Sequence, residues 1–350
     1  MSQIIEIEAL DTLFFRDGKP FTMGQDTVGR SIFPPYPSTL YGAIRSAYLA
    51  NNLSDLDRIN AAEDTSKNLK ITGIFLNMSG NTAVPVPLDL VKEKNKENAL
   101  AYLLSSTNRP KGSFDSNTNL GIEERLSFDK NLTIDSPDEA YVTATGLRSY
   151  MRGNDTVSIV DTSEKIRKET KVGIGRSNAT RATEEGNLYR IQMNRLENIS
   201  LIVAFEGISL AKTGILRIGG EGKVAFYRTR SEDGFEPIRN RPIEGTNFKL
   251  VLLTPAIFKD GWKPFQQNPD LEVTNAAVGK PNWIGGFDVN KQEPKTMRKA
   301  VPAGSVFYIK ATTSDAINQL KAKTSICDNF DDHSNYINQG FGLFFLAKVS

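Results

Sequence analysis

Cysteine and histidine are almost absent from this chain, whose 350 residues include one of each. Cys327 has no second cysteine with which to form an intramolecular disulfide or a zinc site, so we expect a reducing, intracellular setting. His333 stands alone in a polar stretch, which leaves no basis for histidine pairs, Ser-His-Asp triads or His-rich metal sites. The sequence therefore indicates no metal and no cofactor.

Long hydrophobic runs and a large net charge are also missing. Runs such as residues 201–205 fall far short of the roughly 18 apolar residues that suggest a membrane-spanning helix. The first residues lack the basic start and apolar stretch of a secretory signal, so we expect a cytoplasmic protein with no membrane contact. Because 43 Lys and Arg face 41 Asp and Glu, the net charge is +2, and the chain as a whole does not coat nucleic acid by bulk charge.

What is present is a globular composition, with 39% apolar and 24% charged residues, in a chain long enough for two domains. Residues 4–15 and 246–258 both have strand patterns, and each runs into a basic residue, then Asp-Gly, then Lys-Pro-Phe. Chance is an alternative explanation, since these residues are common in turns. The ends of the two halves lower that chance, because residues 208–216 and 314–322 are both predicted as helices that precede a glycine-rich turn and a strand.

We therefore predict an α+β fold of tandem ferredoxin-like (RRM-like) βαββαβ domains, one over residues 1–235 and one over residues 236–350. The first is too long for a bare unit and must carry inserted loops and a basic hairpin. Its polar candidate insertions are residues 92–98, 105–119 and 162–187.

A glycine cluster at Gly219, Gly220 and Gly222, followed by Lys223, is the sharpest local signal. Successive glycines let the backbone approach a ligand and point N–H groups at a phosphate. The cluster is not a Walker A loop, and it runs into a strand rather than opening a helix, so a dinucleotide site is excluded. A helix C-cap before a strand is an equally good interpretation of the string alone.

A second anion-binding candidate is a helix start at Ser38 and Thr39, with Ser38 as its N-cap. The charge distribution supports such sites. Residues 165–230 contain thirteen Lys and Arg and six Asp and Glu, so this segment carries +7 and the rest of the chain −5. Residues 171–190 are predicted as a basic hairpin followed by a strand. A solvated face is the common alternative, but basic charge beside glycine-rich backbone favours a track for phosphates.

The chain resembles the RAMP superfamily of CRISPR proteins, and within it the third subunit of the Cmr (type III-B) RNA-guided effector complex. The resemblance spans nearly the whole chain. It lies in ordered strings at residues 11–18, 20–21, 37–45, 171–174, 180–181, 184–189, 219–225, 298–306 and 340–342.

This resemblance implies a subunit that caps the 5′ tag of the guide RNA and docks beside the large polymerase/cyclase-like subunit and neighbouring backbone RAMP subunits. It implies a hairpin, here residues 171–187, that wedges against the guide. Tag phosphates would be held at the glycine cluster and the helix start, with added basic charge. The implied RNA-binding residues are Arg16, Ser38, Thr39, Arg45, Lys171, Arg176, Arg181, Gly219, Gly220, Gly222 and Lys223.

Two other functions stay open at this point. Some RAMP relatives are endoribonucleases that process guide RNA by acid-base chemistry, for which this chain offers only His333. A protein-only assembly scaffold is the other alternative. We expect no catalytic residue, because a lone histidine in a polar loop is more often solvent-exposed than catalytic.

Overall fold

The computed structural model describes residues 2–16, 28–59, 61, 63–95, 100–108, 124–128, 131–137, 139–177, 180, 182–239, 242–243, 245–265, 268–288, 292–330 and 335–349. It has a mixed α+β fold of mostly antiparallel sheets and few helices, as the α+β prediction requires. Across these residues, no helix combines the length and apolar character that crossing a membrane takes. The helices are α1 (Pro37–Asn51), α2 (Ala144–Met151), α3 (Glu236–Arg239), α4 (Ser314–Lys321) and α5 (Tyr336–Gln339), with 3₁₀ turns at Leu53–Arg58 and Thr65–Asn68.

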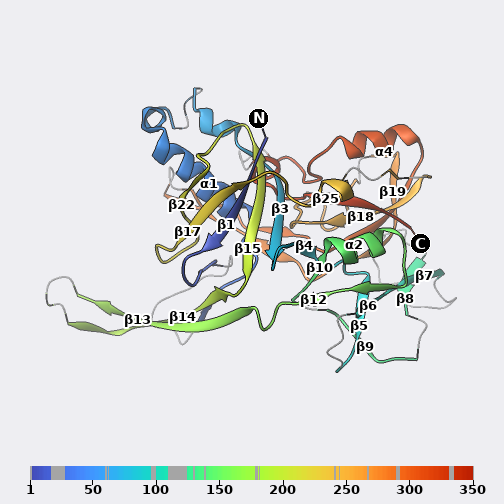
Figure 1. Ribbon diagram of the computed structural model, residues 1–350, viewed down its shortest axis with the longest axis horizontal. Coiled ribbons are helices and arrows are strands. Elements are labelled where there is room, and N and C mark those ends of the chain that lie inside the picture. The colour runs from blue at the N-terminus through green and yellow to red at the C-terminus, as the bar shows by residue number, and fades with distance from the viewer. Residues whose placement is uncertain are drawn as a thin grey trace.

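The first sheet has eight strands and is built from residues up to 230 (Figure 1). Its first strand in the chain, β1, pairs antiparallel with β15 on one side and β17 on the other. The strands in sheet order are β12 (Val160–Asp161), β10 (Ala140–Thr143), β4 (Asn81–Pro85), β3 (Lys70–Met78), β15 (Ile199–Glu206), β1 (Ser2–Ala9), β17 (Val224–Arg230) and β16 (Thr213–Arg217).

The second sheet has four antiparallel strands, all from residues after 246. In order they are β19 (Leu271–Ala277), β24 (Val306–Ala311), β18 (Asn247–Leu252) and β25 (Phe344–Lys348). Within the first sheet, β17, β1, β15 and β3 follow the same order as β25, β18, β24 and β19 in the second. If the four strands of each set are numbered along the chain, their order across the sheet is 4-1-3-2 in both sets.

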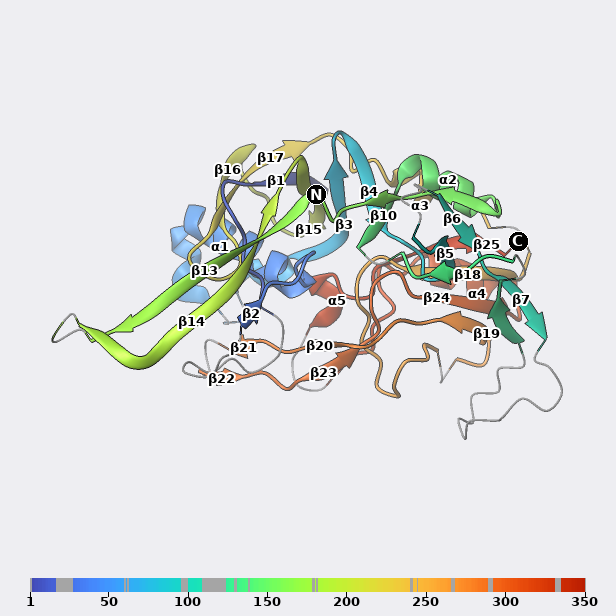
Figure 2. The same cartoon turned by 90° about the horizontal axis from the view of Figure 1, so that it is seen from below.

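The remaining strands form smaller sheets, of which the three-stranded sheet β13-β14-β2 matters most for function. Strands β13 and β14 form a long hairpin that extends away from the rest of the molecule (Figure 2). The strands of all the smaller sheets are β13 (Ile166–Arg176), β14 (Thr183–Leu196), β2 (Val28–Arg30), β11 (Thr156–Ser158), β6 (Leu100–Leu103), β5 (Leu90–Glu93), β9 (Ile134–Asp135), β7 (Ser105–Asn108), β8 (Glu124–Ser127), β20 (Asn282–Ile284), β23 (Arg298–Ala300), β21 (Phe287–Asp288) and β22 (Glu293–Pro294).

Two hydrophobic clusters hold these layers together. Helix α1 buries Leu40, Ile44 and Ala47, which recur at helical spacing, against the first sheet. Strand β18 contributes to both clusters, since Leu250 belongs to the second and Val251 to the first. Alternate side chains of a strand face opposite sides, so the second sheet packs one face against the first half and covers the other itself.

The structure corrects the predicted helix at residues 208–216. Thr213–Arg217 is instead the edge strand β16, which pairs with β17 across the glycine cluster. Ile215 is exposed while Leu216 is buried, an alternation that a strand at a sheet edge tolerates. The predicted helix at residues 314–322 is confirmed as α4, and the helix near residue 38 as α1.

Candidate nucleic-acid interface

The glycine cluster forms the turn between β16 and β17. Gly219 and Gly222 have φ values of 72° and 65°, in the left-handed region that favours glycine. A Cβ atom at Gly219 would lie 2.4 Å from the Phe14 carbonyl oxygen, so close packing also requires glycine there. The helix C-cap interpretation is wrong, because the turn follows a strand rather than a helix.

Backbone hydrogen bonds seat this turn on the segment that leaves β1. The Gly220 amide donates to the Phe14 carbonyl at 2.8 Å, and the Lys223 amide donates to the Gly220 carbonyl at 3.3 Å. Among the described residues, the amides of Gly219, Glu221 and Gly222 have no acceptor. These three amides are therefore left for a phosphate, and the Gly220 amide is not.

Exposed ion pairs surround the turn. Lys171 Nζ lies 2.7 Å from Glu221 Oε2, and Lys223 Nζ lies 2.6 Å from Asp11 Oδ2. The hydrogen bond from Lys223 lowers the pKa of Asp11 to about 2, and the hydrogen bond to Glu221 raises the pKa of Lys171. Exposed pairs of this kind contribute roughly 0–1 kcal/mol each, so a phosphate can replace either carboxylate at low cost.

The base of the hairpin is anchored beside this turn. Phe14 packs against Ile191 and Met193 of β14 in a small separate cluster. Leu13 and Asn194 exchange backbone hydrogen bonds of 2.8 Å in both directions. The hairpin therefore projects from the same segment that seats the glycine turn.

The other face of the hairpin sheet is apolar and basic. Val172 pairs with Arg190, and Arg190 pairs in turn with Val28 of β2. Val172 and Val28 are 56% and 44% exposed, and Arg190 and Arg30 are exposed as well. Such a face presents apolar surface for bases and guanidinium groups for phosphates.

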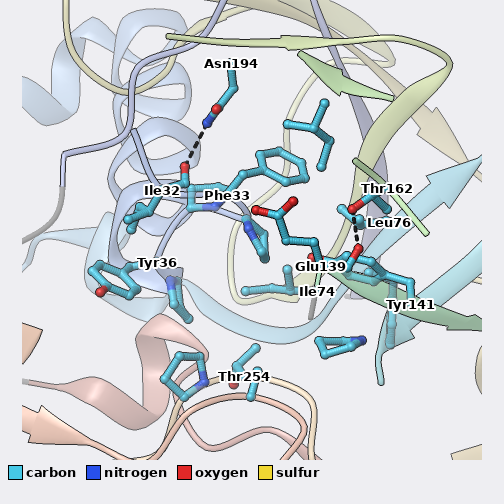
Figure 3. Close-up of a pocket in the computed structure, with 18 of the residues that line it drawn as sticks. Ile32, Phe33, Tyr36, Ile74, Leu76, Glu139, Tyr141, Thr162, Asn194 and Thr254 are labelled. Carbon is cyan, nitrogen blue, oxygen red and sulfur yellow. Dashed lines mark hydrogen bonds between the residues drawn. The ribbon is translucent and has the colours of Figure 1, made fainter. Parts of the chain in front are cut away.

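A pocket of about 390 Å³ lies between the hairpin base, the residue 31–37 loop, the first sheet and residues 253–255 (Figure 3). Asn194 closes one side by donating to the Ile32 carbonyl at 3.1 Å. Glu139 lies at its edge and pairs with Lys168 at 3.5 Å. The wall is largely apolar, with Phe33, Tyr36 and Tyr141 among its aromatic side chains.

The structure brings only some of the predicted RNA-binding residues together. Gly219, Gly220, Gly222, Lys223 and Lys171 meet at the turn. Arg16 follows two residues after Phe14, whose carbonyl accepts from the glycine turn, and forms a β-bridge with Ser31. Arg176 lies in β13, toward the end of the hairpin. Arg181 and the alternative catalytic residue His333 lie outside the described residues.

The helix start and Arg45 differ from their expected roles. Helix α1 begins at Pro37 with Tyr36 as its N-cap residue, so the prediction of Ser38 as N-cap is wrong. Proline is favoured in a first turn because it lacks an amide that would stay unbonded. Within the described part of the chain, no hydrogen bond joins Ser38 or Thr39 to the glycine turn.

Arg45 is committed to an internal contact. It donates to buried Asp64 at 2.8 Å and to the Ser66 hydroxyl at 2.8 Å. A paired arginine whose partner is buried is costly to withdraw, so Arg45 stabilises the turn after α1 and is a poor candidate for binding RNA.

Sequence reasoning missed three charged residues at the interface. Asp11 pairs with Lys223, and Arg195 bridges Asp11 at 3.3 Å and Glu169. Asp11 belongs to the opening string that carried the family resemblance, and Arg195 lies in the basic segment. Asp11 and Arg195 thus lie in segments that the sequence singles out, but nothing in the sequence indicates that the two residues pair.

Comparison with known protein families shows to which family the chain belongs. A family described as CRISPR-associated protein (Cas_Cmr3) matches residues 5–349. The chain belongs to the Cas_Cmr3 family. This confirms the resemblance to the third subunit of the type III-B Cmr complex.

Solved structures agree at the level of the fold. A chain in "Cryo-EM structure of the Type III-B Cmr-beta bound to cognate target RNA and AMPPnP, state 1" has a TM-score of 0.55 and 17% identity, covering 98% of this chain and 96% of that one. A chain in "Cryo-EM structure of the Type III-B Cmr-beta bound to cognate target RNA" has a TM-score of 0.54 and 18% identity over the same shares. No curated protein sequence matches this Cas_Cmr3 chain.

Proposed function

We propose that this Cas_Cmr3 protein is a non-catalytic subunit of a type III-B CRISPR RNA-guided effector complex. It binds and caps the 5′ tag of the guide RNA, docks on the large polymerase/cyclase-like subunit and contacts neighbouring backbone RAMP subunits. The observation that carries this proposal is the projecting β13–β14 hairpin with the glycine turn seated at its base. The family match and the RNA-bound complexes that contain its structural neighbours support it.

Binding proceeds by exchange of charged partners. Guide phosphates displace Glu221 from Lys171 and Asp11 from Lys223, and they accept hydrogen bonds from the free amides of the glycine turn. The exchange costs little because both ion pairs are exposed. The hairpin then wedges against the guide and fixes where the tag ends.

We also propose that the α+β fold consists of two tandem ferredoxin-like domains. Residues 1–235 and 236–350 are two ferredoxin-like domains, which the shared strand order of the two sheets supports. A βαββαβ unit has two helices, and in each half one of them is absent from the described residues. The segment between β15 and β17 contains β16, and the described residues of 253–270 contain no helix. Pro255, Gly261 and Pro264 account for the absence in the second half, since they interrupt helices.

The test is RNA binding by the full chain. Tag-containing and scrambled single-stranded RNAs of equal length are compared, and affinity should fall by roughly 0.7 log units per log unit of salt for each neutralised phosphate. We expect tighter binding of the tag RNA. We also expect about a tenfold loss in the double variant Lys171→Gln/Lys223→Gln near 0.1 M salt.

A matched control is Lys310→Gln/Lys348→Gln, which removes the same charge from exposed strand ends of the second sheet. It should keep the affinity of the unchanged protein. Equal, weak binding of both RNAs together with tight binding to the large subunit would instead favour a scaffold. RNA cleavage that disappears in His333→Ala would contradict a purely binding role.

A further inference from the structure

The second half repeats the architecture of the glycine-turn site. Residues 259–265 follow β18 with the same basic, Asp-Gly, Lys-Pro-Phe string that follows β1. The turn at Gly340 and Gly342 precedes β25 just as the Gly219–Gly222 turn precedes β17. The Gly342 amide donates to the Pro255 carbonyl at 2.8 Å, the counterpart of the 2.8 Å bond from Gly220 to Phe14. The repeat is therefore spatial as well as sequential.

A cavity of about 650 Å³ lies at this second location, and nothing in the proposed tag site uses it. Four lysines and two aspartates contribute to its wall, so its charge is positive. They come from β3, from the turn after β18 and from the segment after α4, and thus from both halves of the molecule. The charged lining residues are Lys70, Lys259, Lys263, Lys323, Asp260 and Asp328.

Local contacts involve part of the acidic charge and part of the basic charge of this wall. Asp328 accepts a hydrogen bond from the Lys259 amide at 2.8 Å, which holds the two segments together. The Lys259 ammonium group lies 5.9 Å from the centre of the Phe330 ring. Lys70 has an ion-pair partner in Glu206 at 3.3 Å, so it is the lysine least available to a ligand.

The C-terminal end of α4 does not account for the lysines of the cavity. A helix C-terminus carries partial negative charge and favours a cation nearby. Lys321 in the last turn already supplies that cation. Lys259 and Lys323 are exposed and converge on the cavity from separate loops, an arrangement that suits an anion between them.

We propose that this cavity is a second phosphate-binding site, which takes the phosphate groups of an RNA strand or of a free nucleotide. Lys259 and Lys323 supply the main charge, and exposed Asn329 supplies a polar group at the same wall. The RNA source depends on the proposed function, because it requires the protein to bind RNA. The nucleotide source does not.

The experiment compares Lys259→Gln/Lys323→Gln with the control Lys310→Gln/Lys348→Gln in the full chain. Binding of a labelled short single-stranded RNA is measured against salt, and binding of a fluorescent ATP analogue is measured separately. For an RNA ligand, we expect about a tenfold loss of affinity and a salt slope smaller by about 1.4 in the cavity variant only. For a nucleotide ligand, we expect loss of analogue binding with RNA binding unchanged.

Each outcome decides the proposal. If the cavity variant and the control bind both probes as the unchanged protein does, or if neither probe binds the unchanged protein, the cavity is not a phosphate site. A loss in the cavity variant counts only if its thermal unfolding matches that of the control. If Lys171→Gln/Lys223→Gln alone weakens RNA binding, and Lys259→Gln/Lys323→Gln also keeps its binding of the ATP analogue, the tag site stands and the second site fails.

Discussion

The glycine-turn interface and the junction between the two halves both contain ion pairs, but they use them in opposite ways. At the interface, the pairs of Lys171 and Lys223 with carboxylates are exposed. At the junction, Lys249 and Asp89 lie 3.0 Å apart with side chains 1% and 0% exposed. An exposed pair can trade its carboxylate for a phosphate, whereas a buried pair has no other partner to accept.

The junction pair is part of a closed network across the two halves. Tyr150 and Tyr308 both donate to Asp89 at 3.0 Å. The Lys249 ammonium group also lies 4.9 Å from the ring centre of Tyr150 and 5.0 Å from that of Tyr308. Asp89 and Tyr150 belong to the first half, and Lys249 and Tyr308 to the second. This network fixes how the halves sit, while the interface keeps its charges exchangeable.

The largest expected effect comes from breaking the junction pair. Lys249→Met leaves the buried Asp89 carboxylate without its cation, which costs roughly 3–5 kcal/mol of unfolding free energy. Lys223→Met removes an exposed partner and should cost less than about 1 kcal/mol. Urea unfolding of the full chain at neutral pH measures both.

Equal losses of unfolding free energy in Lys249→Met and Lys223→Met would contradict this comparison. The double variant Asp89→Asn/Lys249→Met serves as a control, because it removes both charges from the junction. It should recover part of the stability that Lys249→Met loses, since no unpaired charge then stays buried.

Replacing glycine by alanine should also cost more unfolding free energy at the turn in the second half than at the glycine-turn interface. This difference should be smaller than that between the two ion-pair variants. Gly342 has a φ of 68°, and a Cβ atom there would lie 2.8 Å from Cys327 Sγ and 2.9 Å from the Cys327 amide nitrogen. Gly342→Ala should therefore cost about 3 kcal/mol, from backbone strain and overpacking together. Gly222 has a φ of 65° but only Arg217 within 4.0 Å, so Gly222→Ala should cost about 1 kcal/mol.

Thermal and urea unfolding of the two alanine variants would test this difference. Similar losses would show that the second turn is as open as the first. In the preference for tag RNA over scrambled RNA the order should reverse at equal folded fraction, with the preference lost in Gly222→Ala and kept in Gly342→Ala.

Local sequence patterns predicted the elements that nearby residues determine. The basic hairpin, helix α4 and the strand after each glycine turn all carry their signals within a few residues. Residues 208–216 failed because their apolar run fits a helix as well as a strand. The choice was made by pairing with β17, on the far side of the glycine turn.

The partners of charged residues could not be predicted for the same reason. Lys223 pairs with Asp11, which lies 212 positions away, and Lys249 pairs with Asp89, 160 positions away. A list of basic residues thus mixed Lys171 and Lys223, whose carboxylate partners are exposed, with Arg45, which is held by buried Asp64. Only the fold separates charges that can bind a ligand from charges that hold the chain.

The smallest expected effect sharpens what an exchangeable ion pair means. Lys223 holds the pKa of Asp11 at about 2, so the carboxylate is ionised at neutral pH and competes with phosphate for Lys223 and Arg195. Asp11→Asn removes this competitor and should raise RNA affinity by about two- to fivefold with a steeper salt dependence. Glu272→Gln is a matched control, because it removes an exposed carboxylate from β19 in the second sheet. Fluorescence anisotropy near 0.1 M salt measures both variants. A gain in the control as large as in Asp11→Asn would mean that overall charge, and not the exchange at this turn, governs binding.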